Sequence, residues 1–213
     1  MWAERVLDEG RLNHCIILGV DSYITGQTLT ALHAAGRLLT AKNSDGFLPG
    51  EAAAAVLISP VSSAPVAIEC RGIGWGREKA TLRSGVPMRG DGLAQAFRGA
   101  FKAAGYGFPE VHYRIADVSG EHYAFKEAAL ALLRTMRVRK ENFYIWHPAD
   151  CVGRTGAASV PLILGIALAA ARRCYSPGPG ALCHFADDSG VRAALVVRER
   201  DNRDPSGRSP VPQ

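Results

Sequence analysis

Apolar strand-like runs and longer helical patterns follow one another along almost the whole chain. Strand character is found at 15–20, 51–59, 65–74, 111–116, 142–146, 181–185 and 192–198, and helical spacing at 28–39, 93–104, 121–138 and 155–173. Alternating β and α segments fold into layers in which helices cover the faces of a sheet. The sequence therefore predicts an α/β layered domain.

Local signals refine the boundaries of these segments. Gly36 is a weak point in the first helical segment, and Asp91 is placed to act as the N-cap of the helix that begins near Leu93. The turn at 60–65, Pro-Val-Ser-Ser-Ala-Pro, fits either a hairpin or a crossing between two halves of the molecule.

The length of 213 residues suits one substantial domain, which we predict to span 1–199. From about Asp201 onward the chain is rich in Pro, Arg, Ser and Asp and has no apolar periodicity. Segment 200–213 is therefore predicted to be a disordered basic tail.

Charge and cysteine usage limit the class of protein. The net charge is +5, but no lysine-rich run with interleaved aromatic residues appears, so nucleic acid is not an expected partner. Five cysteines without a CxxC pair favour a reducing compartment. The longest apolar run, 157–171, is interrupted and shorter than the ~20 residues of a spanning helix. We expect a cytoplasmic protein without a membrane segment.

The histidines have no metal-ligand spacing, so neither a metal site nor another cofactor is expected. Their positions are 14, 33, 112, 122, 147 and 184.

The segment 43–55, Asn-Ser-Asp-Gly-Phe-Leu-Pro-Gly-Glu-Ala-Ala-Ala-Ala, contains a shaped loop. Gly46 and Gly50 permit positive φ, Pro49 fixes one further angle, and the Asp45 side chain can hold the turn. The apolar run that follows has no alternation, which suits a strand covered on both faces. The loop is interpreted either as a tight turn before a buried strand or as an active-site loop.

Three motifs together resemble the β-ketoacyl synthases of the thiolase superfamily. They are Gly19-Val20-Asp21, then Asp45-Gly46-Phe47 with Gly50-Glu51 and Ala53, then Gly156-Ala157-Ala158 opening a buried helix. The resemblance covers residues 2 to about 199. It implies a thiolase-like layered α-β-α-β-α fold, represented here by the end of its first half and its complete second half.

The same resemblance implies that this chain lacks the family's catalytic groups. The family uses a cysteine nucleophile, whose position would lie before Met1, and two histidines, whose positions hold Asp117 and Gly153 here. The family's glycine-rich loop near the C-terminus is replaced by residues 186–190, Ala-Asp-Asp-Ser-Gly. We therefore expect no catalytic residue in this chain.

The former pocket would be lined by Phe47, Glu51, Asp117, Gly153, Arg154, Asp187 and Asp188. Arg154 stands in the family's catalytic turn, where it could form an ion pair with Asp117 that fills the pocket. The alternative is that both are solvated charges at loop ends.

Cys151 is the one alternative nucleophile, because His147 and Asp150 lie close to it in sequence. Pro148 makes the local backbone extended, and sequence proximity does not bring a base within hydrogen-bond reach. A structural loop with a core thiol is the preferred interpretation.

The sequences of these motifs are similar to those of a bacterial group of thiolase-like proteins associated with type VI secretion effector loci. This implies an inactive adaptor or co-chaperone whose partner is an effector, its chaperone or an N-terminal thiolase half, in a dimer or hetero-complex. The alternative is a β-ketoacyl-ACP synthase or acyltransferase completed by a missing N-terminal half or a partner. A third possibility is an incomplete product that exposes apolar faces and associates.

Overall fold

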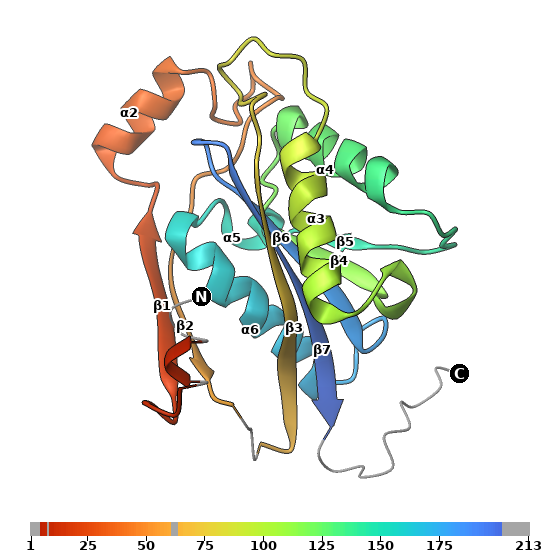
Figure 1. Cartoon of the computed structure of the whole chain (residues 1–213). Coiled ribbons are helices and arrows are strands. Elements are labelled where there is room, and N and C mark those ends of the chain that lie inside the picture. Colours follow the sequence, from red (N-terminus) through yellow and green to blue (C-terminus); the bar gives the residue numbers. More distant parts are fainter. Residues whose placement is uncertain (1–4, 8, 61–63, 202–213) are drawn as a thin grey trace.

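The computed structural model describes residues 5–7, 9–60 and 64–201, and Figure 1 shows their arrangement. The strands are β1 (Cys15–Ser22), β2 (Glu51–Ile58), β3 (Val66–Arg77), β4 (Tyr113–Ala116), β5 (Ile145–Trp146), β6 (Gly180–Ala186) and β7 (Val191–Asp201). The helices are α2 (Gly26–Ala34), α3 (Asp91–Ala104), α4 (His122–Thr135), α5 (Ala149–Val152) and α6 (Ser159–Arg172), with short 3-10 turns at Phe108–Glu110 and Gly156–Ala158.

The strands form two separate sheets. β1 and β2 pair antiparallel as a two-stranded ribbon, and the other strands form one sheet in the order β3-β7-β6-β4-β5. In the larger sheet β4 runs parallel to both of its neighbours, whereas β7 is antiparallel to β3 and to β6. Since β2 and β3 belong to different sheets, the segment between them is a crossing and not a hairpin.

Helices cover both faces of the larger sheet, in agreement with the predicted α/β layers. On one face, α3 and α4 bury Phe97, Ala100 and Ala131 against Leu182 and Val196. On the other face, α6 buries Ile163 and Ala167 against Ile115 and Cys183. α6 also contacts β1 and β2, so it lies between the two sheets (Figure 1).

Strand β3 is held against α3 by direct contact between main chains. Gly72, Gly74 and Gly76 alternate along the strand and therefore point to one face. A Cβ atom at Gly74 would clash with the carbonyl oxygen of Ala96, and each of the other two glycines faces an α3 carbonyl in the same way. Only glycine allows the helix to lie this close to the strand.

Several predicted helix boundaries were wrong for local reasons. The first helix ends at Ala34, and the chain then turns at Gly36 with a φ of 65°. The N-cap of α3 is Gly90, with a φ of 68°, and Asp91 is the first helical residue and not the cap. The segment 155–173 divides into a 3-10 turn and α6.

Other segments also differ in extent from the sequence prediction. The strand predicted at 142–146 is reduced to Ile145 and Trp146, because residues 137–144 form an irregular connection. β7 continues to Asp201, beyond the predicted domain boundary at 199. The predicted tail from 202 onward lies outside the described residues. Within the described part of the chain, no helix has the length and apolar character needed to cross a bilayer.

His184 on β6 occupies the core below α3. Its ring meets Phe97 edge-on at 5.5 Å between centroids, and its Nε2 has no hydrogen-bond partner. Burial, and then the charge of Arg114, lower the pKa of this imidazole to about 3. His184 is therefore a neutral core residue.

The close approach of β3 and α3 predicts opposite effects of one substitution at two glycines. Gly74→Ala should lower the free energy of unfolding by about 1–3 kcal/mol, because the new methyl group must push α3 away from the strand. Gly165→Ala on the open face of α6 should raise it by about 0.5–1 kcal/mol, because alanine favours the helix. Urea unfolding of both variants measures the difference, and equal effects would contradict the main-chain contact.

Candidate functional site

Four charged side chains from four separate segments meet at one end of the larger sheet. Arg37 follows α2, Glu121 directly precedes α4, Arg154 follows the turn at Gly153, and Asp188 lies in the turn between β6 and β7. Together they form what we call the four-charge cluster. Its formal charges sum to zero.

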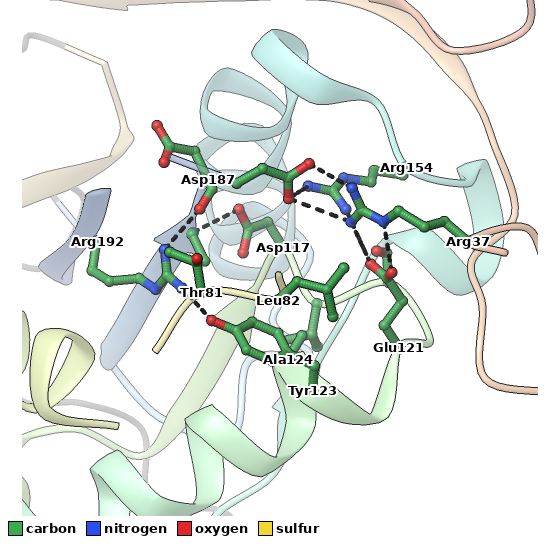
Figure 2. Close-up of a pocket in the computed structure, with 14 residues that line it drawn as sticks. Arg37, Thr81, Leu82, Asp117, Glu121, Tyr123, Ala124, Arg154, Asp187 and Arg192 are labelled. Carbon is green, nitrogen blue, oxygen red and sulfur yellow. Dashed lines mark hydrogen bonds and ion pairs between the residues drawn. The ribbon is translucent and has the colours of Figure 1, made fainter. Parts of the chain in front are cut away.

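Arg37 is the centre of this cluster. Its Nε and one terminal nitrogen each donate to a different oxygen of Glu121, both at 2.8 Å, and it also donates to Asp188 (Figure 2). Arg154 donates to Glu121 and to Asp188, in each case at 3.3 Å. Two-point contacts between a guanidinium and a carboxylate are among the strongest hydrogen bonds in proteins.

The cluster changes the ionisation of its members. The hydrogen bond with Glu121 raises the pKa of Arg37, although burial opposes the shift. Burial alone would raise the pKa of Asp188, but the hydrogen bond from Arg37 and the charge of Arg154 lower it. The site therefore contains two fixed positive charges and two carboxylates that accept hydrogen bonds from them.

The Phe47 ring packs against the guanidinium groups of both arginines. Its side chain is fully buried, and its ring centroid lies 5.4 Å from Cζ of Arg37 and 5.0 Å from Cζ of Arg154. Tyr23 meets the same ring edge-on at 5.9 Å. A cation near an aromatic face is stabilised by the ring, so Phe47 fixes where both guanidinium groups lie.

The loop at 43–50 is held by main-chain hydrogen bonds on both sides. The amide of Phe47 donates to the Arg37 carbonyl, whereas Leu48 and Gly50 exchange hydrogen bonds with the backbone of Arg154. Asn43, and not Asp45 as predicted, holds the turn, because its amide group donates to the carbonyls of Gly36 and Leu38.

The Asp45 carboxylate instead accepts from the His122 amide at 2.7 Å. This contact satisfies a free N–H group in the first turn of α4. The loop therefore connects α4 to the segments that carry Arg37 and Arg154.

A second buried network lies next to the cluster. Arg192 donates to Glu127 at 2.7 Å, with both side chains almost fully buried, and to the hydroxyl of Tyr123 at 3.0 Å. Tyr123 donates onward to the Ala80 carbonyl, and Glu78 accepts from the first-turn amide of Gly92. Burial raises the pKa of Glu127, whereas its hydrogen bond from Arg192 opposes the rise.

Asp117 lies between two small cavities. One has a volume of about 40 Å³ and is lined by members of both networks (Figure 2). The other, of about 10 Å³, lies beside Gly153 and Thr155. A cavity needs roughly 10–15 Å³ to hold a water molecule, so these spaces suit waters and not an acyl chain. Burial raises the pKa of Asp117 to about 6, although a 3.0 Å hydrogen bond from the Ala186 amide opposes this.

The predicted ion pair between Asp117 and Arg154 was wrong, because Arg154 pairs with other carboxylates. The ion pairs of Arg154 in the described structure are with Glu121 and Asp188. Arg154 still acts on Asp117 at longer range, because its positive charge partly offsets the rise that burial causes in the pKa of that carboxyl.

The structure brings most of the predicted pocket residues together. Asp117, Arg154, Asp187 and Asp188 line the larger cavity, and Gly153 lines the smaller one with a φ of 71°. Asp187 holds its own turn, since its carboxylate accepts from Ser189 and from the Val191 amide. Glu51 lies elsewhere, on the outer face of the β1–β2 ribbon, where it accepts from Ser22 at 3.0 Å.

Cys151 is exposed on the short helix α5, so the interpretation as a core thiol in a loop was wrong. The His147 Nδ1 and Asp150 Oδ2 atoms are 2.9 Å apart, but they are poorly aligned for a hydrogen bond. Among the described residues, the polar contact of His147 is with Asp150 and not with the Cys151 thiol. The structured part of the chain also contains no group of three or more side chains suited to a metal ion.

Sequence reasoning did not identify Arg37, Glu121, Tyr123, Glu127 or Arg192 as site residues. One signal for two of them is a charge in an apolar context: Glu127 stands on the alanine-rich face of α4, and Arg192 directly precedes the apolar run 193–197. Charged residues are rarely buried unless paired, so such positions indicate a buried ion pair.

No family model and no curated protein matches the chain. Solved structures do match. A β-ketoacyl synthase from Burkholderia phymatum STM815 has a TM-score of 0.79 at 15% identity, over 93% of this chain and 58% of that one. The ketosynthase ApeO in complex with its chain length factor ApeC, from Xenorhabdus doucetiae, gives 0.78 at 16% identity, over 92% and 56%.

An oxazolomycin ketosynthase domain from Streptomyces albus JA3453 gives a TM-score of 0.79 at 17% identity, over 96% of this chain and 44% of that one. The chain therefore spans about half the length of these ketosynthase chains. Such identities establish the fold alone. They confirm the predicted thiolase-like layered fold.

The cluster predicts unequal effects for two carboxylate-to-amide substitutions. Glu121→Gln should lower the free energy of unfolding by about 2–4 kcal/mol, because Arg37 and Arg154 stay buried with a single remaining carboxylate. Asp91→Asn, which removes an exposed pair with Arg134, should cost less than about 1 kcal/mol. Denaturant unfolding compares the two, and a near-neutral Glu121→Gln would show that the cluster is not stabilising.

Asp117 predicts a pH-dependent difference between the protein and its Asp117→Asn variant. Because the folded-state pKa is raised to about 6, the folded protein holds this proton more tightly than the unfolded chain. Ionisation between about pH 4 and 6 therefore destabilises the fold. The variant should gain stability relative to the native protein over this window, by an amount on the order of 2 kcal/mol. Melting curves from pH 4 to 7 test this, and a constant difference would contradict it.

Proposed function

We propose that the protein is a catalytically inactive, ketosynthase-like protein that acts by binding another protein. The observation that carries this proposal is the four-charge cluster, which fills the end of the sheet where the resemblance places catalytic groups. Asp117 and Gly153 stand at the two positions that would hold histidine. The cavity beside the cluster, of about 40 Å³, supports the same view, because an acyl or pantetheine chain needs far more room.

The one buried cysteine among the described residues is not an activated nucleophile. Cys183, which is fully buried on β6, has its pKa raised to about 12 by burial. Such a thiol remains protonated and is shielded from substrate. His184, the next residue, is buried on the opposite face of the strand and points toward Phe97.

The partner we propose is a secreted bacterial effector, its chaperone or a thiolase-like half, with the protein serving as an adaptor or co-chaperone in type VI secretion from the cytoplasm. This choice of partner is supported by motifs such as the loop at 43–54, whose sequences are similar to those of the bacterial thiolase-like group associated with effector loci. Among the structural neighbours, one ketosynthase is solved with its chain length factor and another with an acyl-carrier protein. Protein partnership is therefore compatible with this fold.

The test is incubation of the purified protein with acyl-CoA and with acyl-carrier thioesters, followed by intact-mass spectrometry. We expect no acyl adduct and no thioester turnover, with an active ketosynthase run in parallel as the positive control. A stable acyl adduct on any residue would overturn the proposal of inactivity and favour an acyl-thioester enzyme.

The adaptor role needs a separate measurement. The protein should co-purify in fixed stoichiometry with an effector or effector chaperone encoded beside it when the two are co-expressed. If none of these neighbouring proteins forms a complex with it, the adaptor role is contradicted. The proposal that the protein is catalytically inactive would not be affected.

A further inference from the structure

A second group of basic side chains lies at the other end of the larger sheet from the four-charge cluster. β7 runs from the turn beside that cluster to this other end, where it carries Arg198 (Figure 1). His112 directly precedes β4, and Lys140 lies in the connection between α4 and β5. We call His112, Lys140 and Arg198 the basic site. Within the described ranges, none of the ion pairs involves Lys140 or Arg198.

The backbone fixes the proton position on the His112 ring. The amide of Gly180 donates to His112 Nδ1 at 3.2 Å, and Gly180 is also the β6 residue paired with Arg198. A ring nitrogen that accepts a hydrogen bond carries no proton, so the neutral imidazole has its N–H group at Nε2. His112 Nε2 is therefore a hydrogen-bond donor for a group outside the β6 backbone.

The two cations of the basic site lie close to this ring. Burial lowers the pKa of His112, and the positive charges of Lys140 and Arg198 lower it further. His112 therefore remains neutral near pH 7 and acts as a donor without adding a third charge.

Arg114 adds positive charge beside the basic site. It follows His112 by two residues in extended chain, so both side chains leave the same face. Its Cζ atom lies 5.1 Å from the centroid of the Phe143 ring, and Lys140 Nζ lies 5.4 Å from the same centroid. Burial lowers the pKa of Arg114 and of Lys140, and Arg114 Nε has no hydrogen-bond partner. These cations are partly withdrawn from water without an ion pair to compensate them.

The carboxylates of this region have other partners. Glu110 accepts from the Gly107 amide at 2.7 Å and acts on Lys140 only through its charge, and Glu199 accepts from the Ser176 hydroxyl at 3.1 Å. Glu69 lies opposite Arg198 in the β3–β7 register, but it forms ion pairs with two other arginines. The basic site therefore keeps its positive charge.

We propose that the basic site binds a phosphate group, either as free phosphate or as a phosphate monoester. A phosphate monoester carries a charge of about −1.5 to −2 at neutral pH and has three strong acceptor oxygens. Lys140 and Arg198 supply two positive charges, and His112 Nε2 supplies a neutral donor. Hydrogen bonds from lysine and arginine to phosphate are charge-assisted and therefore strong. The proposal does not depend on the adaptor role.

Calorimetric titration of the full chain at constant ionic strength tests the proposal, with inorganic phosphate in one arm and methyl phosphate in the other. Each should bind at one saturable site with a Kd of about 1 mM or lower. Tighter binding of inorganic phosphate identifies free phosphate as the ligand, and tighter binding of methyl phosphate identifies a monoester. Acetate should bind at least about tenfold more weakly, because it carries a single charge. In nitrogen NMR spectra, phosphate should shift the His112 Nε2 resonance.

A matched pair of variants locates the binding. Lys140→Gln should weaken phosphate binding at least about tenfold, because it removes one charge-assisted contact. The control is Lys126→Gln, which removes the same charge from an exposed position on α4 and should leave the Kd unchanged. Circular dichroism establishes that both variants fold.

Four results would overturn the proposal. The first is the absence of saturable binding up to about 20 mM phosphate. The second is acetate binding as tight as phosphate binding. The third is a Kd, or a phosphate-induced shift of the His112 resonance, that is unchanged in Lys140→Gln. The fourth is equal weakening by Lys126→Gln, since it would mean a general attraction of anions to a basic protein.

Discussion

The need to neutralise two buried guanidinium groups determines how this end of the molecule is built. Arg37 and Arg154 are almost withdrawn from water, and a buried charge is tolerated where it is paired and hydrogen-bonded. Glu121 and Asp188 meet that requirement only if four segments far apart in sequence converge. The start of α4, the β6–β7 turn and the loop at 43–50 therefore hold one another in place, and the small cavities are what remains between them.

The cluster shows what the loops of a thiolase-like layered fold can carry at one end of the larger sheet. Layers of helix and sheet bring loops to one end of the sheet whatever those loops carry. Here the loops carry charges that pair with one another. Phe47 has a corresponding role: its ring, fully buried in the loop, positions two arginines through its faces.

Much of the fold followed from sequence, because strands and helices are marked by local patterns. The alternation of β and α segments gave the layers, and Gly36 was recognised as a weak point of the first helix. The predictions for Asp91 and Asp45 were wrong: Gly90 takes the cap position before Asp91, and the Asp45 carboxylate accepts from the distant His122 amide instead of holding its own turn. Both outcomes depend on neighbours that the sequence does not place. The pairing of Arg37 with Glu121, 84 residues apart, has no local signature at all. The position of a loop can be inferred from the sequence, but the partner of a buried charge can be identified only in the three-dimensional structure.

The alternating glycines of β3 have a mechanical consequence. Where a helix rests on side chains, its distance from the sheet changes with the volume of those side chains. α3 rests on β3 through the backbone at Gly72, Gly74 and Gly76, so its distance from that strand is set by main-chain contact. A smaller side chain elsewhere in the core would therefore not let α3 move closer to β3.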